Sequence, residues 1–210
     1  MITSAVAVPV QPDRFTSGRT YRTVVELLVA LHAADPSTTD HLWRVAARVT
    51  AVGEALGLPQ EDLRILWYAG LLHDVGKIGV PEEVLRKAGR LTRTERALVQ
   101  LHPELGAALL EDLEGLKPAA PLVLYHQERF DGRRDGSYPG YPTGLAGEAI
   151  PLGARILAVV DAFDAMTSDR PYRRGFSPAA AVEELRREAG QQFDPRVVEA
   201  FLAVLGQAAA

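Results

Sequence analysis

The fold is organised around the stretch Leu71-Leu72-His73-Asp74-Val75-Gly76-Lys77-Ile78-Gly79-Val80-Pro81. An apolar run leads into adjacent His73 and Asp74, and Gly76 then favours the end of a helix. Neighbouring side chains on a helix diverge by roughly 100°, but at a helix end both can converge on a metal ion beyond the terminus. An imidazole and a carboxylate suit first-row transition metals. Lys77 follows, where its ammonium is expected to meet an anionic substrate.

For the His-Asp pair alone, the alternative is an ordinary helix end with a solvated aspartate and a capping histidine. Other groups of the same kind, at helix ends or in apolar helical contexts, favour a metal site instead, because a helical bundle can bring them to one cavity. They are His41, His102, His126 and Asp161. Asp161 interrupts an apolar run, and a buried carboxylate needs a partner or a metal. Asp164 fits a helix cap and a group supporting the ligands equally well, whereas His32 is expected to lie on the surface.

Composition limits the class of protein. The chain has 210 residues, of which 47% are hydrophobic and 24% charged, as in a globular domain with a sizeable core. Its net charge of −4 argues against a polynucleotide partner. With no cysteine, any metal must be held by His and carboxylates. No apolar run reaches the roughly 20 residues of a membrane span, and no signal peptide is evident, so no membrane association and a cytoplasmic location are expected.

Apolar spacing, proline positions and capping residues predict helices throughout and no strands. The expected helices cover residues 21–33, 40–56, 59–73, a short piece after 81, 92–101, 104–113, 118–128, 152–166, 178–188 and 195–205. Residues 131–150 form the main irregular segment, with five Gly and two Pro. The prediction is an all-α fold, with a loose arm over residues 1–17 and a single domain over 18–210.

Taken in order, the motifs resemble the HD-GYP domain, a subgroup of the HD-type metal phosphohydrolases that degrade the bacterial second messenger cyclic di-GMP. The resemblance covers roughly residues 20 to 205. The matching motifs are His41-x-x-Arg44, Gly70 to Pro81, Leu101-His102-Pro103-Glu104, Tyr125-His126, Gly140-Tyr141-Pro142, Gly144-Leu145-x-Gly147-Glu148-x-Ile150-Pro151, and Asp161 to Tyr172.

This resemblance implies an HD-domain helical bundle with an added C-terminal helical GYP subregion. The implied metal ligands are His41, His73, Asp74, His102, His126 and Asp161. They would hold two divalent transition-metal ions, Fe or Mn being favoured, with Asp74 bridging them and acting with Lys77 in catalysis. Lys77 would also face the phosphodiester, Arg170 and Arg173 would hold substrate phosphates, and Tyr141 would contact the nucleotide.

The chain departs from the family pattern at three places. Where the family has two consecutive His, this chain has His126-Gln127, so a neutral amide replaces one ligand of the second metal. Ser37 stands where some members carry a Glu that supports a third metal. The link from Arg133 to Pro139 is longer than usual, which puts the placement of Tyr141 in doubt.

The leading hypothesis is a metal-dependent phosphodiesterase that opens cyclic di-GMP to pGpG and continues to GMP in some circumstances. One alternative is a protein of the same fold that binds cyclic di-GMP or a protein partner, its activity weakened by Gln127. A second alternative is an HD phosphohydrolase of another nucleotide. The sequence leaves open a signalling-protein partner or a homodimer.

Overall fold

The computed structural model describes residues 15–16, 18–35, 39–136, 138–169 and 174–208. Over these residues it contains helices and one isolated bridge between Ala189 and Phe193, and no strand, which confirms the all-α prediction. The α-helices are α1 Gly18–Ala34, α2 Thr39–Ala55, α3 Gln60–Leu72, α4 Glu82–Leu85, α5 Arg93–Val99, α6 His102–Glu111, α7 Ala120–Tyr125, α8 Leu152–Thr167, α9 Pro178–Glu188 and α10 Pro195–Ala208. The short 3₁₀ helices within these described residues are η2 Val75–Gly79, η3 Lys117–Ala119 and η4 Gly147–Ala149. None of the helices in the described part of the chain has both the length and the hydropathy that crossing a bilayer requires.

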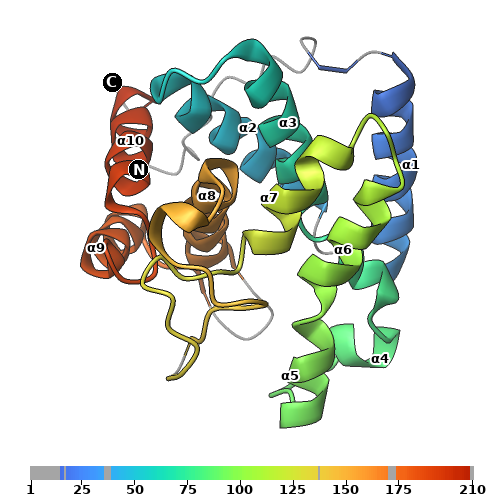
Figure 1. Cartoon of the computed structure of the whole chain (residues 1–210). Helices are drawn as coiled ribbons and strands as arrows, with labels where there is room; N and C mark the ends of the chain where they lie inside the picture. The colour runs from blue at the N-terminus through green and yellow to red at the C-terminus, as the bar shows by residue number, and fades with distance from the viewer. Residues whose placement is uncertain (1–14, 17, 36–38, 137, 170–173, 209–210) are drawn as a thin grey trace.

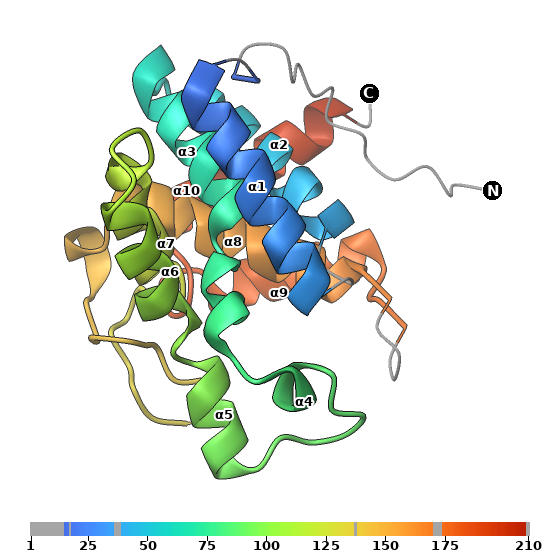
Figure 2. The same ribbon diagram turned by 90° about the vertical axis from the view of Figure 1, so that its right-hand side faces the viewer.

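Helix α8 lies near the centre of the bundle. Figure 1 shows α9 and α10 on one side of it and α1 and α6 on the other, with α2 and α3 above. The view in Figure 2 places α1 in front of α3, which it contacts, and α5 below α6. Helix α2 packs against both α3 and α8, and η2 packs against α6. Helices from both halves of the chain therefore pack against α8.

Local sequence signals set most helix ends. Thr92 and Glu95 form the expected capping box at the start of α5. The Ser177 side chain caps α9, and Pro178 occupies its first position. Helix α3 ends at Leu72, and the chain continues into η2.

Gly76 explains how closely η2 approaches α6. A Cβ atom on Gly76 would lie 2.0 Å from the His102 carbonyl oxygen and 2.5 Å from the Gly106 nitrogen. Both are backbone atoms and cannot rotate away, so only glycine permits this contact. The same glycine thus sets the distance between Asp74, just before η2, and His102, at the start of α6.

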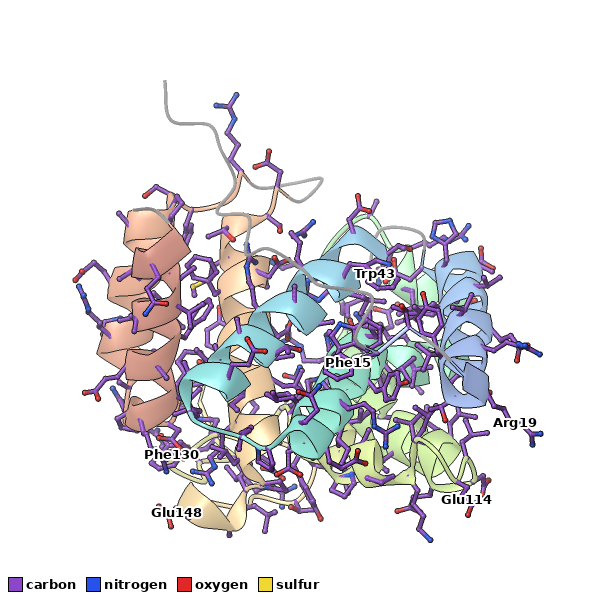
Figure 3. The ribbon with its side chains drawn as sticks, turned by 90° about the horizontal axis from the view of Figure 1, so that it is seen from above. Phe15, Arg19, Trp43, Glu114, Phe130 and Glu148 are labelled. Carbon is purple, nitrogen blue, oxygen red and sulfur yellow. The ribbon has the colours of Figure 1, made fainter. Side chains whose placement is uncertain are left out.

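An aromatic cluster around Trp67 anchors α1, α2 and α3 to each other. The Trp67 ring lies 5.7 Å from Phe15, 6.2 Å from Tyr21 and 5.9 Å from Trp43, measured between centroids. Figure 3 shows Phe15 and Trp43 among the side chains between the helices, and Arg19 and Glu114 at the edge of the molecule. Phe15 is buried, although it falls within the segment expected to be a loose arm. Residues 1–14 and 17 of that segment lie outside the described residues.

Candidate metal centre

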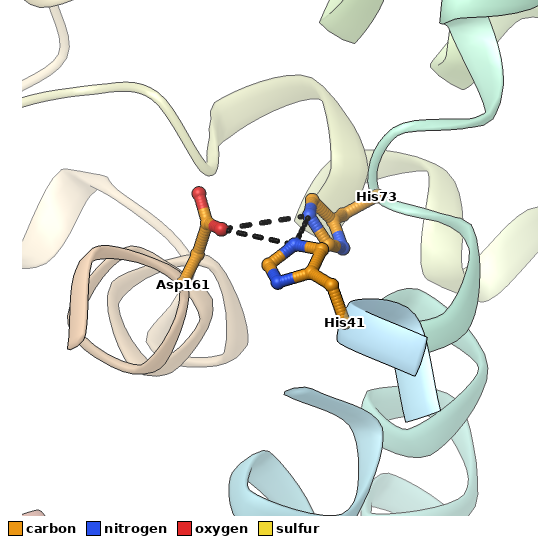
Figure 4. A group of neighbouring side chains, drawn as sticks. All are labelled: His41, His73 and Asp161. Atoms are coloured by element: carbon orange, nitrogen blue, oxygen red, sulfur yellow. Dashed lines mark hydrogen bonds and ion pairs between the residues drawn. The ribbon is translucent and has the colours of Figure 1, made fainter. Parts of the chain in front are cut away.

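The first group of potential ligands comprises His41, His73 and Asp161, supplied by α2, the end of α3, and α8 (Figure 4). The His41 Nε2 atom lies 3.4 Å from His73 Nε2 and 3.3 Å from Asp161 Oδ1. His73 Nε2 lies 3.8 Å from the same carboxylate oxygen. The three side chains come from residues far apart in the sequence and point at one another.

The second group comprises Asp74, His102 and His126, all of them buried. His102 Nε2 lies 3.3 Å from His126 Nε2 and 3.5 Å from Asp74 Oδ1. The other oxygen of the same carboxylate, Oδ2, lies 3.6 Å from His73 Nε2. Each oxygen of Asp74 therefore faces a histidine of a different group, as a bridging carboxylate would.

The hydrogen bonds of the imidazoles leave each Nε2 atom facing the cavity. The Nδ1 atoms of His73, His102 and His126 lie 2.7–2.9 Å from the backbone carbonyl three residues earlier in each case. Because a carbonyl oxygen only accepts, Nδ1 carries a proton in each ring, and in the neutral imidazole the lone pair is then on Nε2. This tautomer suits an Nε2 metal ligand oriented by its other nitrogen.

His41 is oriented differently, by a buried carboxylate. Its Nδ1 atom donates to Asp164 Oδ2 at 2.8 Å. Two arginines of α2 also donate to Asp164: Arg44 at 2.8 Å to each oxygen, and Arg48 at 2.5 Å to Oδ1. Asp164 and Arg48 are both buried. Of the two roles expected for Asp164, the structure shows the supporting one, since the carboxylate fixes the orientation of His41.

The pKa values of most of these groups favour the protonation states that a metal requires. Burial is the main cause that lowers the pKa of His126 to about 3, and it also lowers the pKa of His102. Burial alone would raise the pKa of Asp161, but the hydrogen bond from His41 and the nearby histidines lower it to about 2. Neutral imidazoles and ionised carboxylates are metal ligands without further proton loss.

His41 is the exception. Burial lowers its pKa, but the hydrogen bonds to Asp161 and Asp164 outweigh that effect and raise the pKa to about 9. In the protein without metal, His41 is therefore protonated at neutral pH, and it must release a proton before Nε2 can bind a cation.

Lys77 contacts the ligand set rather than open solvent. Its Nζ atom donates to Asp74 Oδ2 at 2.7 Å. Burial acts to lower the Lys77 pKa, but the charge of Asp74 outweighs it and the pKa is raised, so the side chain stays cationic. Its expected contact with a phosphodiester stays a prediction. Arg170 and Arg173, expected to hold phosphates, and Ser37 lie outside the described residues.

The loop that follows α7 is tied to the site by Glu128. This buried carboxylate accepts hydrogen bonds from the Thr143 amide, the Thr143 hydroxyl and the Gly144 amide at 2.6–3.0 Å. These bonds engage its carboxylate with the loop, and Glu128 lies beyond the end of α7, which the sequence pattern predicted to continue to residue 128. The Tyr141 ring lies 6.3 Å from the ring of His102, edge to face, so the longer link has not displaced Tyr141 from the site.

The donor set fits divalent cations. Four imidazoles and two carboxylates form the two groups. His41, Asp74, His102 and Asp161 line a cavity of about 560 Å³, together with Lys77, Gln127 and Ser168. His and carboxylate ligands are typical of Fe, Mn and Zn sites. His32 does not join them, since its Nδ1 atom pairs with the Thr39 hydroxyl at 2.7 Å near the surface.

Sequence reasoning missed the roles of Arg48 and Glu128. Arg44 and Arg48 follow His41 by three and seven residues, a spacing that puts all three on one face of a helix and was an available signal. Glu128 gave no such signal, because its partners lie in an irregular loop 15 and 16 residues further on.

Comparisons with known proteins place the chain in a family. The model of the HD domain family matches residues 23–197. The cyclic di-GMP phosphodiesterase response regulator RpfG of Xanthomonas campestris is 42% identical over 186 residues, which are 88% of this chain and 48% of that protein. The chain thus spans about half the length of this relative.

Two solved structures share the fold. A cyclic GMP-AMP specific phosphodiesterase of V. cholerae has a TM-score of 0.66 at 22% identity, covering 88% of this chain and 48% of that one. An HDG"Y"P protein of Bdellovibrio bacteriovorus has a TM-score of 0.63 at 20% identity, covering 80% of this chain and 52% of that one. The chain belongs to the HD domain family.

Proposed function

We propose that this chain is a metal-dependent phosphodiesterase that hydrolyses cyclic di-GMP to pGpG, with GMP as a further product. The main support is the pair of ligand groups joined by Asp74, in which each carboxylate oxygen faces a different group. The relative named a cyclic di-GMP phosphodiesterase, at 42% identity, supports the choice of substrate.

Two divalent ions, Fe or Mn being favoured, would be held in two places. His41, His73 and Asp161 would hold the first, His102 and His126 the second, and Asp74 would bridge both. When bound, such ions supply Lewis-acid chemistry, activating water and offsetting negative charge on a phosphodiester. Gln127 lines the cavity beside His126 and offers a weaker donor than the second His of the family pattern.

The protein's own cations would position the substrate. Lys77 lines the cavity and forms an ion pair with Asp74. Its charge would face a non-bridging phosphate oxygen there. Arg170 and Arg173 would clamp the phosphates, and Tyr141 would pack beside the nucleotide. The Asp164–His41 hydrogen bond would keep His41 Nε2 aimed at the first ion throughout the reaction.

An assay of the purified chain with Mn²⁺ or Fe²⁺ tests this function. Chromatography should show cyclic di-GMP converted to pGpG, and His32→Ala should match the wild type because His32 lies outside the site. Tight binding of cyclic di-GMP without turnover would instead identify a binding module weakened by Gln127. Turnover of another nucleotide alone would identify a different phosphohydrolase.

A further inference from the structure

A second cavity, of about 370 Å³, opens beside the metal centre. Gln127, Val99 and Asp161 line both this cavity and the metal cavity, so the two lie side by side. Its volume lies within the roughly 300–1,000 Å³ range of small-molecule sites. A ligand held at the metal centre can therefore extend into it.

The walls of the second cavity suit a flat heterocycle. Val99 of α5 and Ala158 and Ala162 of α8 supply apolar surface, and Tyr141 supplies an aromatic ring. Aromatic and small apolar side chains are the usual neighbours of a nucleobase outside a duplex. The walls thus favour the base of a nucleotide over its phosphate.

Arg96 is the available charged group in this cavity. Apart from the expected metal ligands, two other charged side chains line this cavity, and both have hydrogen-bond partners. Arg129 donates to Asp131 at 2.9 and 2.7 Å, and Glu128 accepts from the loop at Gly144. Within the described part of the chain, the Arg96 guanidinium has no hydrogen-bond or ion-pair partner, although the residue lines the cavity. Gln100, which follows α5 and lies one turn after Arg96, adds a carboxamide to the same cavity wall.

We propose that this second cavity binds one guanine base of the substrate and that Arg96 donates to its O6 and N7 atoms. The proposal rests on the proposed function. A guanidinium fork matches the two adjacent acceptors of guanine, whereas adenine presents a donor beside N7, which a guanidinium cannot pair with. Arg96 would therefore set the preference for guanine over adenine.

The test compares binding of cyclic di-GMP and cyclic di-AMP by titration calorimetry to the wild type, Arg96→Ala and Arg96→Lys, without reliance on turnover. Arg96→Ala should weaken cyclic di-GMP binding roughly tenfold, the effect of one bidentate base contact, and leave cyclic di-AMP binding unchanged. Arg96→Lys should not restore the preference, because a lysine keeps the charge but lacks the fork. Arg93→Ala is the matched control, since Arg93 lies on the same helix and lines neither of the two cavities.

Four results would overturn the assignment. Equal losses for both ligands, restored by Arg96→Lys, would show that Arg96 contacts a phosphate. Equal effects of Arg93→Ala and Arg96→Ala would show that Arg96 contributes only through its positive charge and not through a contact with the base. Unchanged binding in Arg96→Ala would remove Arg96 from the site while leaving the proposed function intact, whereas a wild type that binds and hydrolyses no cyclic dinucleotide would refute both.

Discussion

Asp164→Ala should destabilise the protein strongly, because it removes the acceptor shared by two arginines and a histidine. The Arg48 side chain is 9% exposed, so its charge cannot be rehydrated in place. The Arg44 side chain is 40% exposed and can turn to water. The loss is therefore dominated by one buried unpaired guanidinium, which costs about 3–5 kcal/mol. Since domains are stable by about 5–15 kcal/mol, this is a large fraction of the total.

Urea unfolding followed by circular dichroism, at pH 7 with a chelator, measures this loss without any contribution from metal. The double variant Asp164→Ala with Arg48→Met should recover much of it, because the buried charge is removed along with its partner. Asp112→Ala, an exposed position on α6's C-terminal side, should change the free energy of unfolding by no more than about 0.5 kcal/mol.

The stability that Asp164 contributes should depend on pH. Burial would raise the pKa of Asp164, but the hydrogen bonds from Arg44 and His41 hold it well below the ordinary value. A group with a depressed folded-state pKa stabilises the protein above its unfolded pKa of about 3.9 and loses this contribution as pH falls toward the folded value. The difference between wild type and Asp164→Ala should therefore shrink below about pH 4. A loss under about 1 kcal/mol at pH 7, or no recovery with Arg48→Met, would refute the buried-pair reasoning.

Three further changes test the site. Gln127→His should raise both the metal retained after dialysis and the rate of hydrolysis, since imidazole is the better donor; no change in either would refute that role for the amide. Arg170→Ala and Arg173→Ala should each weaken substrate binding by about 1.5–3 kcal/mol with metal content unchanged, and wild-type affinity in the double variant would place both on a solvated turn. Gly76→Ala should lower the melting temperature and metal retention together, because its Cβ would meet the His102 carbonyl oxygen at 2.0 Å; a variant equal to wild type would show that η2 can shift.

Much of the fold follows from local signals. The capping box at Thr92 and the prolines at 118, 151, 178 and 195 mark helix starts within a residue or two of those observed. These signals act through backbone hydrogen bonds close in sequence, and so they can be recognised without tertiary information. The buried position of Phe15 could not be recognised this way, because its contact with Trp67 joins residues 52 apart and has no periodic pattern.

The sequence predicted which side chains the structure brings together, and their role as metal ligands stays a prediction. The structure brings all six expected ligands together, because each sits on a helix end or an apolar helical face that the bundle turns inward. What surrounds them was not predictable. Asp164 had two equal interpretations until α2 placed Arg44 and Arg48 against it. Arg96 likewise lies on an exposed helix, and only the packing of the loop around Tyr141 makes that helix one wall of a cavity.

The central claim is that Asp74 joins two metal ions in a phosphodiesterase, and Asp74→Ala tests it most directly. Metal content by mass spectrometry and conversion of cyclic di-GMP to pGpG should be measured together in wild type and variant after loading with Mn²⁺. The wild type should hold two ions per chain and form pGpG, while the variant should lose bound metal and all hydrolysis and retain its helical circular dichroism. A folded Asp74→Ala variant with full metal content and turnover would contradict the account.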